Sequence, residues 1–347
     1  MSDIRQQTVL HIVSDNLTAE TLRKSDIGGD ILAWQDALYE GPVPSTKSLD
    51  ELCEERARYF AARSMGEYSD ISEAYKQRNQ VLKSYINYTK VVLWFDIDLY
   101  GQLQLIQLIA WFDTQNTGKT EITQIESSKI PAKGSVKRHL FQLNSIEIAK
   151  LYQSASEVTM LQAEISTQAW QAFTAKTPEK LLSFYRKDLS SMPTVKNALL
   201  RLAQEYPSKA TGLSRTESLI IEAVRQRHYT EGEIFEFVQK KEPLAFMTQP
   251  VFLYHLNHLI NARYPVLKKE VLEYDSALEV ASDGVNDQMV VHDYKICHTN
   301  YTNQVLNKWV DWIQLNGINR WIGGVHLNEG NIWRYDAETR SIKKTYI

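Results

Sequence analysis

The first 130 or so residues alternate between short apolar runs and longer amphipathic segments. The apolar runs have the length and the β-branched content of buried strands, and they cover residues 8–13, 30–34, 91–95 and 121–126. Helical patterns fill the intervals, over residues 17–24, 48–64, 72–88 and 99–112. Alternating strands and helices indicate a mostly parallel sheet covered on both faces. We therefore predict an α/β domain over residues 1–144.

Beyond residue 144 the pattern becomes helical, and we predict a helical connector over residues 145–210. Two capping boxes follow, in which a Ser or Thr is followed three residues later by Glu. They start at Ser214 and Thr230 and predict the beginnings of two helices. Thr248 can cap a third helix that runs through Ile260.

Extended stretches at 271–274 and 277–280 come after these three helices. Three short helices followed by a β-hairpin are the arrangement of a winged helix. Residues 320–325 and 333–336 further predict a terminal hairpin rich in aromatic residues. We therefore predict a winged-helix-like α+β domain over residues 211–347.

Composition narrows the class of protein. A chain of 347 residues is too long for one ordinary core, and a net charge of −3 gives no general bias toward nucleic acid. Cys53 and Cys297 are the only cysteines and lie far apart in the sequence. Two such cysteines in a long chain are typical of reduced thiols in the cytosol rather than of a disulfide framework. The chain begins without the apolar core of a signal peptide, and no apolar run approaches the roughly 18 residues of a membrane span. We predict a cytoplasmic protein that does not enter a membrane.

Polar side chains gather where the predicted N-terminal strands end. In open parallel α/β sheets, ligands bind beyond the carboxyl ends of the strands. Several carboxylates in one crevice can perform acid–base chemistry or hold a divalent cation such as magnesium. We predict catalytic roles for five residues, with the histidine as acid or base: His11, Asp36, Glu40, Asp96 and Asp98. We predict ligand-binding roles for four more: Asp15, Asn16, Gln102 and Gln104.

Each of these residues has a structural alternative. Asp15 and Asp98 stand where helices begin, and Asp is a frequent helix cap. His11 lies among apolar residues, where a hydrogen-bonded neutral histidine is common. Gln102 and Gln104 lie on a helix that is apolar nearly all round, so they need buried partners, which are either the neighbouring loops or a ligand.

Other site classes find little support in the sequence. The turn after the first strand has no glycine, and neither GxGxxG nor GxxxxGK[ST] occurs, which argues against a standard dinucleotide or nucleoside-triphosphate site. No set of residues has an established zinc spacing, so we predict no defined metal site, and the cofactor stays unknown. The winged helix suggests nucleic-acid binding through four arginines: Arg215, Arg225, Arg227 and Arg263. However, winged helices also serve protein contacts.

Several spaced blocks resemble a bacterial family known as domain of unknown function 1835. They are His11-Ile12-Val13, then Gly29–Asp36 with Glu40-Gly41-Pro42-Val43, then Trp94–Gln104, then Gly212–Glu217, and finally Arg320–His326 with Trp333–Asp336. The chain differs from the family pattern after the first strand, where the family usually has Asn-Gly-Asp and this chain has Ser14-Asp15-Asn16. It also differs at Ile97, where His is common, and at Gly101, where Asp or Cys is common. The resemblance implies the architecture and a recurring set of polar residues at the strand ends, and it implies no activity.

Three functional hypotheses remain open. The first is a crevice at the N-terminal strand ends that binds a small polar or phosphorylated ligand such as a nucleotide, with hydrolase or transferase activity as an extension. The second is a non-enzymatic regulator that binds nucleic acid through the winged helix. The third is an interaction module whose winged helix contacts a protein partner.

Overall fold

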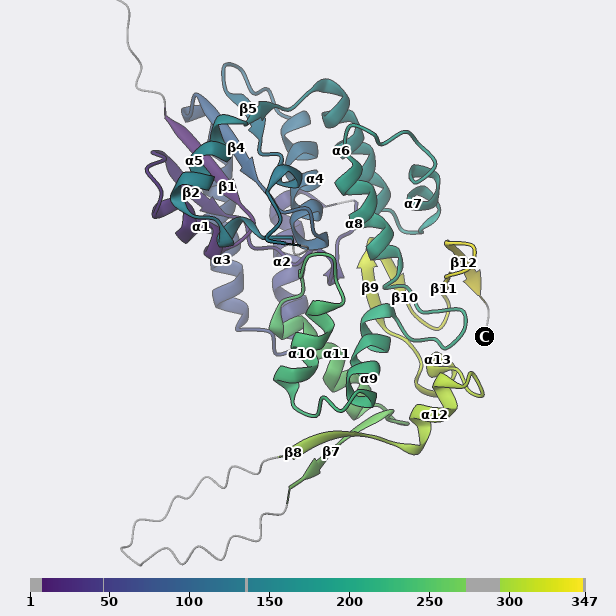
Figure 1. Cartoon of the computed structure of the whole chain (residues 1–347). Coiled ribbons are helices and arrows are strands. Elements are labelled where there is room, and N and C mark those ends of the chain that lie inside the picture. Colours follow the sequence, from purple (N-terminus) through teal and green to yellow (C-terminus); the bar gives the residue numbers. More distant parts are fainter. Residues whose placement is uncertain (1–7, 46, 135–136, 273–293, 346–347) are drawn as a thin grey trace, which may run out of the picture.

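The N-terminal region is built on a twisted, mostly parallel sheet (Figure 1). The structure is a computed structural model that describes residues 8–45, 47–134, 137–272 and 294–345. The five strands lie in the order β2 (Asp30–Ala33), β1 (Val9–Val13), β4 (Lys90–Trp94), β5 (Glu121–Gln124) and β6 (Ser156–Glu157). The first four are parallel, and β6 runs antiparallel to β5. The predicted α/β fold of this region is confirmed.

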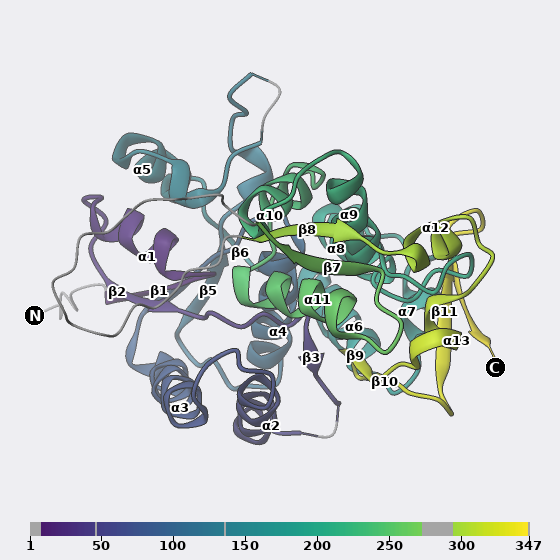
Figure 2. The same ribbon diagram turned by 90° about the horizontal axis from the view of Figure 1, so that it is seen from below.

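Helices cover both faces of this sheet, as Figure 2 shows most clearly. On one face lie α1 (Asn16–Arg23), α5 (Ser145–Gln153) and the short 3-10 turn η3 (Leu140–Gln142). On the other lie α2 (Leu49–Ala61), α3 (Tyr68–Lys83) and α4 (Leu99–Asp113). Alternate residues of β1 divide between the two cores, with Val9 and Val13 facing α1 while Leu10 and Ile12 face α4.

The helix α4 is the centre of the molecule. Because its side chains are apolar nearly all round, it is buried on every side and needs a second layer beyond the sheet. That layer consists of α6 (Met160–Phe173), α7 (Glu179–Phe184) and α8 (Pro193–Ala203). Two further 3-10 turns complete this part, η1 (Tyr85–Asn87) and η2 (Ser127–Lys129).

Three more helices and a pair of antiparallel strands follow, at the lower end of Figure 1. They are α9 (Arg215–Arg225), α10 (Glu231–Lys240), α11 (Gln249–Asn261), β7 (Leu267–Val271) and β8 (Tyr294–His298). Both predicted capping boxes are present, at Ser214 and at Thr230. The predicted strand over 277–280 lies outside the described residues, and β7 pairs with β8 instead.

The C-terminal residues return to the N-terminal domain. After α12 (Asn300–Leu306) and α13 (Trp312–Asn316), the chain forms β9 (Arg320–Gly323) and β10 (Val325–Leu327). The strand β9 pairs with β10 and also with β3 (Gly41–Pro42), which lies nearly 280 residues earlier in the chain. The last two strands, β11 (Ile332–Asp336) and β12 (Ser341–Thr345), pair with each other. The terminal hairpin predicted between 320–325 and 333–336 is therefore wrong in its pairing, because each of its halves has a different partner.

A glycine pair makes this return possible. A Cβ on Gly324 would lie 1.9 Å from the carbonyl oxygen of Thr174, and one on Gly323 would lie 2.2 Å from that of Phe173. The end of α6 thus passes directly over the turn between β9 and β10. One cluster of buried side chains runs from Leu10 to Ile342, so the three predicted segments share a continuous core. Within the described ranges, no helix combines the length and the apolar character that crossing a bilayer requires.

Candidate functional site

The carboxyl ends of β1 and β4 carry the acidic residues predicted from the sequence. The chain runs outward from β1 to β2 and then returns to place β4 on the other side of β1. This reversal of strand order between β1 and β4 is the position where open α/β sheets form a crevice for ligands. Asp15 follows β1, and both Asp96 and Asp98 follow β4.

Asp96, Asp98 and His139 form a compact cluster at this crevice. The Nδ1 atom of His139 lies 3.1 Å from Oδ2 of Asp96 and 3.7 Å from Oδ2 of Asp98. One potential ligand atom from each residue lies within 4.8 Å of the others. Two carboxylates and one imidazole at this separation can share protons or bind one divalent cation.

Local backbone interactions hold the two acids in place. Asp98 caps α4, because its Oδ1 accepts a 2.6 Å hydrogen bond from the backbone N–H of Gly101, which leaves Oδ2 on the side of His139. Asp96 accepts a 3.1 Å hydrogen bond from the backbone N–H of Leu140. Gly101 is required here, since a Cβ at this position would lie 2.5 Å from the carbonyl oxygen of Asp96.

His139 was not among the residues that the sequence predicted. It precedes η3, where its ring stacks on Phe141 with a centroid separation of 4.9 Å. It lies in a loop between β5 and α5, which carries neither a periodic pattern nor a motif. Its 43-residue separation from Asp96 makes the contact purely tertiary.

The electrostatics of the cluster favour bound protons. Burial raises the pKa of Asp98 to about 8, and the charge of Asp96 adds to the effect. Burial also raises the pKa of Asp96, although hydrogen bonds from His139 and Leu140 oppose the rise. Burial works against the charged form of His139, but the two carboxylates overcome it and raise the pKa of the imidazole. All three adjacent groups therefore hold their protons to a higher pH than they would in water.

Asp15 contributes its charge from the neighbouring strand. It caps α1, because one of its carboxylate oxygens accepts a 2.8 Å hydrogen bond from the N–H of Thr18. Its second oxygen accepts a 2.6 Å hydrogen bond from the hydroxyl of Ser14. Asn16 is the first residue of α1 and is exposed. The negative charge of Asp15 raises the pKa values of Asp96, Asp98 and His139. Asp15 and Asp98 thus act as caps and also take part in the electrostatics of one site.

A cavity of about 610 Å³ borders this cluster. It lies between the ends of β4 and β5, helix α8 and the connection from α10 to α11. Its polar lining includes Asp98, Ser127 and four basic residues: Lys137, Arg138, Arg201 and Arg215. The lining also includes Glu242, which pairs with Arg201 at 2.8 Å, and Arg138 pairs with Glu147 at 2.6 Å. The volume is that of a small-molecule site, and Lys137 is the basic side chain of the lining that has no ion-pair partner among the described residues.

The two buried glutamines of α4 support the loops around the site. Nε2 of Gln102 donates a 2.8 Å hydrogen bond to the carbonyl of Asp96. Nε2 of Gln104 donates a hydrogen bond of 3.2 Å to the carbonyl of Tyr100. The Tyr100 hydroxyl in turn donates a 3.2 Å hydrogen bond to the carbonyl of Ser14. Oε1 of each glutamine is buried and has no hydrogen-bond partner among the described residues. Each of these oxygens can therefore still accept a hydrogen bond.

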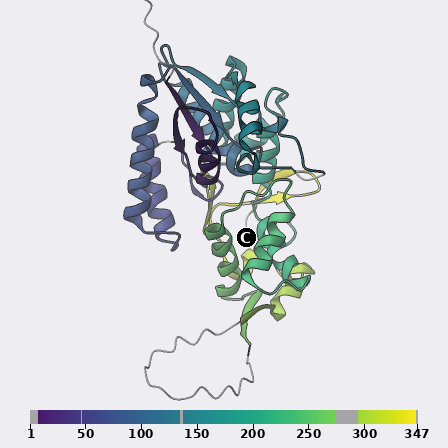
Figure 3. The same ribbon diagram turned by 60° about the vertical axis from the view of Figure 1, so that its left-hand side comes forward.

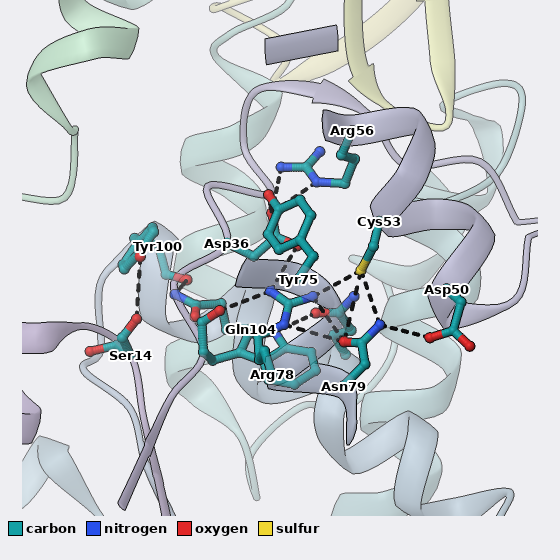
Figure 4. Close-up of polar contacts among 12 residues, drawn as sticks. Ser14, Asp36, Asp50, Cys53, Arg56, Tyr75, Arg78, Asn79, Tyr100 and Gln104 are labelled. Carbon is teal, nitrogen blue, oxygen red and sulfur yellow. Dashed lines mark hydrogen bonds and ion pairs between the residues drawn. The ribbon is translucent and has the colours of Figure 1, made fainter. Parts of the chain in front are cut away.

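Asp36 lies in a different place, at the centre of a buried ion-pair network (Figure 4). Its Oδ1 accepts a 2.8 Å hydrogen bond from Nε of Arg56, and both side chains are fully buried. Arg78 lies 3.5 Å from its other oxygen and also donates to Sγ of Cys53 at 3.0 Å. The guanidinium of Arg78 stacks 3.8 Å from the ring of Trp34. Two guanidinium groups thus share one buried carboxylate, and this network joins α2 and α3, which lie to the left of the sheet in Figure 3, to the end of β2.

Glu40 lies in a second buried network, between the N-terminal domain and α11. Its Oε1 accepts a 2.5 Å hydrogen bond from the Tyr59 hydroxyl, and its Oε2 lies 3.2 Å from Nε2 of His255. Burial opposes ionisation of Glu40, yet His255 and Arg320 hold the pKa of the carboxyl below its ordinary value. Arg320 also pairs with Glu205 at 3.0 Å. Glu40 thus connects residues from both ends of the chain.

His11 is separate from all of these groups. Its Nδ1 accepts a 3.0 Å hydrogen bond from the indole N–H of Trp94, and its Nε2 lies 3.2 Å from the carbonyl of Gly28. Burial lowers the pKa of His11, which favours the neutral ring. With both nitrogens engaged within the core on the α1 face, His11 is placed away from the acidic cluster.

The four arginines predicted for nucleic-acid binding have different local surroundings. Arg215 lines the 610 Å³ cavity and pairs with Glu242 at 3.4 Å. Arg225 ends α9, Arg227 has a left-handed φ of 66°, and Arg263 lies over the ring of Tyr264. Helix α11, which would have to enter a DNA groove, packs against the N-terminal domain through Thr248 and His255.

Comparison with known proteins adds no assignment. No protein-family model matches the chain, and no curated protein matches it in sequence. The site therefore has to be interpreted from its own geometry.

Proposed function

We propose that the crevice beyond β1 and β4 binds a divalent cation together with a small phosphorylated ligand, such as a nucleotide. The observation that carries this proposal is the convergence of Asp96, Asp98 and His139 at the edge of a cavity with basic walls. A mixed set of two carboxylates and one imidazole suits Mn²⁺ or Zn²⁺, and the carboxylates alone suit Mg²⁺. Asp96, Asp98 and His139 would hold the cation, which would supply positive charge for a phosphate, and Lys137 on the cavity wall would face that phosphate.

The energetic cost of the cluster supports a binding role. Burial of Asp98 beside a second carboxylate raises its pKa to about 8, so the charged form of this side chain is unfavourable in the folded protein. The folded protein retains a buried carboxyl at this position, although a neutral side chain would remove the cost of burying the charge. Strongly perturbed groups beside a cavity are typical of functional sites.

A hydrolase or transferase activity is a natural extension of this proposal. Asp98 and His139 have raised pKa values and could take or supply a proton during attack on phosphorus. Release of inorganic phosphate from nucleotides in the presence of Mn²⁺ is the corresponding assay.

The binding test is a thermal-shift and calorimetric titration of the full chain with Mn²⁺, Zn²⁺ and Mg²⁺. We expect at least one of these cations to raise the melting temperature. Asp98→Asn should abolish the shift, because the amide keeps the cap on Gly101 but lacks the negative charge. Asp26→Asn is the matched control, since Asp26 is an exposed acid near the end of α1 and far from the cluster in sequence. Absence of a shift with all three cations would refute the cation site.

The ligand is tested in the same way with ADP, a nucleoside monophosphate and inorganic phosphate, each with the cation that binds. Lys137→Glu should weaken phosphate-dependent binding without changing cation affinity, because Lys137 lines the cavity and is exposed. Lys133→Glu, an exposed lysine of the same loop that does not line the cavity, should have little effect. Equal binding by both lysine variants and the unaltered protein would contradict the phosphate assignment.

We further propose that α9, α10, α11, β7 and β8 form a winged-helix-like unit whose main contact lies within this chain. Three contacts of α11 support this: Thr248 N–H donates to the Tyr39 hydroxyl at 2.9 Å, Tyr254 contacts Arg63, and His255 meets Glu40. A helix held in this way is packed against the N-terminal domain, and the segment before it, residues 242–246, lines the cavity. The nucleic-acid alternative through Arg225 and Arg263 would require α11 to leave this position.

We also propose membership in the domain of unknown function 1835 family and a cytoplasmic location. The blocks that resemble the family include both the Trp94–Gln104 segment of the acidic cluster and the residues around Asp36 and Glu40. The free thiols of Cys53 and Cys297 suit a reducing compartment.

A further inference from the structure

A second cavity, of about 520 Å³, lies near the C-terminal strands. It is formed by the connection between α8 and α9, the connection between α12 and α13, and the hairpin of β11 and β12, which gather near the C-terminus in Figure 1. Its lining includes five basic residues and one tryptophan: Lys209, Lys308, Lys343, Lys344, Arg334 and Trp309.

The charge of this cavity differs from that of the whole protein. Five basic side chains face only two acids, Asp311 and Asp336, in a chain whose net charge is −3. Both acids are already engaged, Asp311 by Arg334 at 2.7 Å and Asp336 by Lys209 at 3.2 Å. Among the described residues, Lys308 and Lys343 have no ion-pair partner. The cavity thus has positive charge left for an anion.

Strand register adds a second observation. Arg334 of β11 lies directly opposite Lys343 of β12. Like charges in directly opposed positions destabilise a pair of strands. Asp311 neutralises the charge of Arg334 and so reduces this repulsion. An anion bound in the cavity would also neutralise the charge of Lys343.

Trp309 supplies a flat apolar surface beside these charges. Its side chain is 74% exposed, although tryptophan normally buries most of its large surface. The preceding residue, Lys308, adopts a left-handed φ of 63°, which non-glycine residues rarely adopt. The chain therefore holds a strained turn that presents a lysine and an exposed indole side by side.

We propose that this cavity binds single-stranded nucleic acid, with one base stacked on Trp309 and the flanking phosphates bound by Lys308 and Lys343. Sites for single strands combine a basic groove with aromatic platforms, since every unpaired base has a face that can stack. A base-paired duplex does not expose such a face, so the site should prefer single strands. This surface is distinct from the acidic crevice and from the arginines of the winged-helix-like unit.

The test is fluorescence anisotropy of the full chain with a labelled oligothymidylate of about 12 nucleotides, a length within the range of known single-strand sites. Binding is measured at about 50 mM and about 200 mM salt, because counterion release makes phosphate contacts depend on salt. Trp309→Ala should weaken binding about fivefold or more through the loss of stacking. Lys308→Ala with Lys343→Ala should weaken it further and reduce the slope of log K against log salt by roughly 0.7 per lost contact.

Controls separate this surface from others. Lys240→Ala, at an exposed position of α10, should leave binding unchanged. Arg225→Ala and Arg263→Ala test the alternative surface and should also have no effect. Absence of binding at low salt, or equal affinity for a duplex, would overturn the proposal. It would also be overturned if Trp309→Ala bound the oligonucleotide as well as the unaltered protein does, or if only the arginine variants lost oligonucleotide affinity. If Trp309→Ala instead changes the oligomeric state while no oligonucleotide binds, the surface is a protein interface and the proposal is wrong.

Discussion

The Nδ1 atom of His139 lies 3.1 Å from Oδ2 of Asp96, although the two residues are 43 positions apart in the chain. The contact depends on the loop after β5, which turns back across the end of β4 and places the backbone N–H of Leu140 on the same carboxylate. One loop therefore supplies both a titrating partner and a backbone donor to the acidic cluster. This relationship raises the pKa of His139, opposes the rise that burial causes in the pKa of Asp96, and makes the cluster a candidate for cation binding.

Replacing Asp98 by Asn should stabilise the protein at alkaline pH. The folded-state pKa of Asp98 is about 8, above the value of 3.8 for a free carboxyl, so the folded state binds more protons between these pH values. The stability of the unaltered protein should then fall as pH rises from about 4 to about 8, by up to about 1.4 kcal/mol per pH unit from this group. Asp98→Asn removes this contribution. Urea unfolding across the pH range measures it, and Asp26→Asn should retain the slope of the unaltered protein.

Cation affinity should increase with pH. A cation that binds at the cluster must displace the proton of Asp98 and compete with the proton shared by Asp96 and His139. We expect the affinity for Mn²⁺ to rise by up to about tenfold per pH unit between about 6 and 8 for each proton displaced. Calorimetry in two buffers with different ionisation enthalpies counts the released protons. Affinity that does not change with pH would mean that the cation binds elsewhere.

Gly101→Ala should damage the cluster, although alanine normally favours a helix over glycine by about 1 kcal/mol. The new Cβ would lie 2.5 Å from the carbonyl oxygen and 2.8 Å from the nitrogen of Asp96, so the backbone after β4 must move. We expect a loss of about 1–3 kcal/mol in unfolding free energy, as in other overpacked sites, together with weaker Mn²⁺ binding.

Gly232→Ala is the matched control for this change. Gly232 also lies in the first turn of a helix, α10, and a Cβ there would meet no atom within 4 Å. This variant should be neutral, or more stable by up to about 1 kcal/mol, with unchanged cation affinity. If both alanine variants behaved alike, the close approach at Asp96 would have no role.

Asp36→Ala should destabilise the fold without affecting cation binding. The change would leave Arg56 and Arg78 buried near each other without their shared carboxylate. Loss of one partner from a buried ion pair typically costs about 3–5 kcal/mol. Thermal unfolding measures the loss, and Mn²⁺ titration of the folded fraction measures the site. A large loss of cation affinity at unchanged stability would instead assign Asp36 to the site.

The sequence predicted the acidic half of the cluster because its signal is local. An apolar strand, two acids and an apolar helix occur consecutively at 90–113, and the carboxyl ends of parallel strands lie at one edge of a sheet. The same rule grouped Asp36 and Glu40 with Asp96 and Asp98. The rule considers only the ends of the strands and does not predict the direction of each side chain. Side-chain direction separates them, since Asp36 turns toward Arg56 on α2 and Glu40 toward His255 on α11.

What the sequence determined by itself was the order of the elements, the parallel sheet and the helix caps, because these follow from periodicity and from hydrogen bonds between residues a few positions apart. The structure alone decided the long-range partners. His139 joins Asp96, β9 pairs with β3, and His255 meets Glu40 through contacts between segments that carry no mutual signal in one sequence. Such contacts depend on how the packed layers orient their loops, and packing is a property of the whole core. The chemistry of the crevice therefore arises only when the chain has folded around α4.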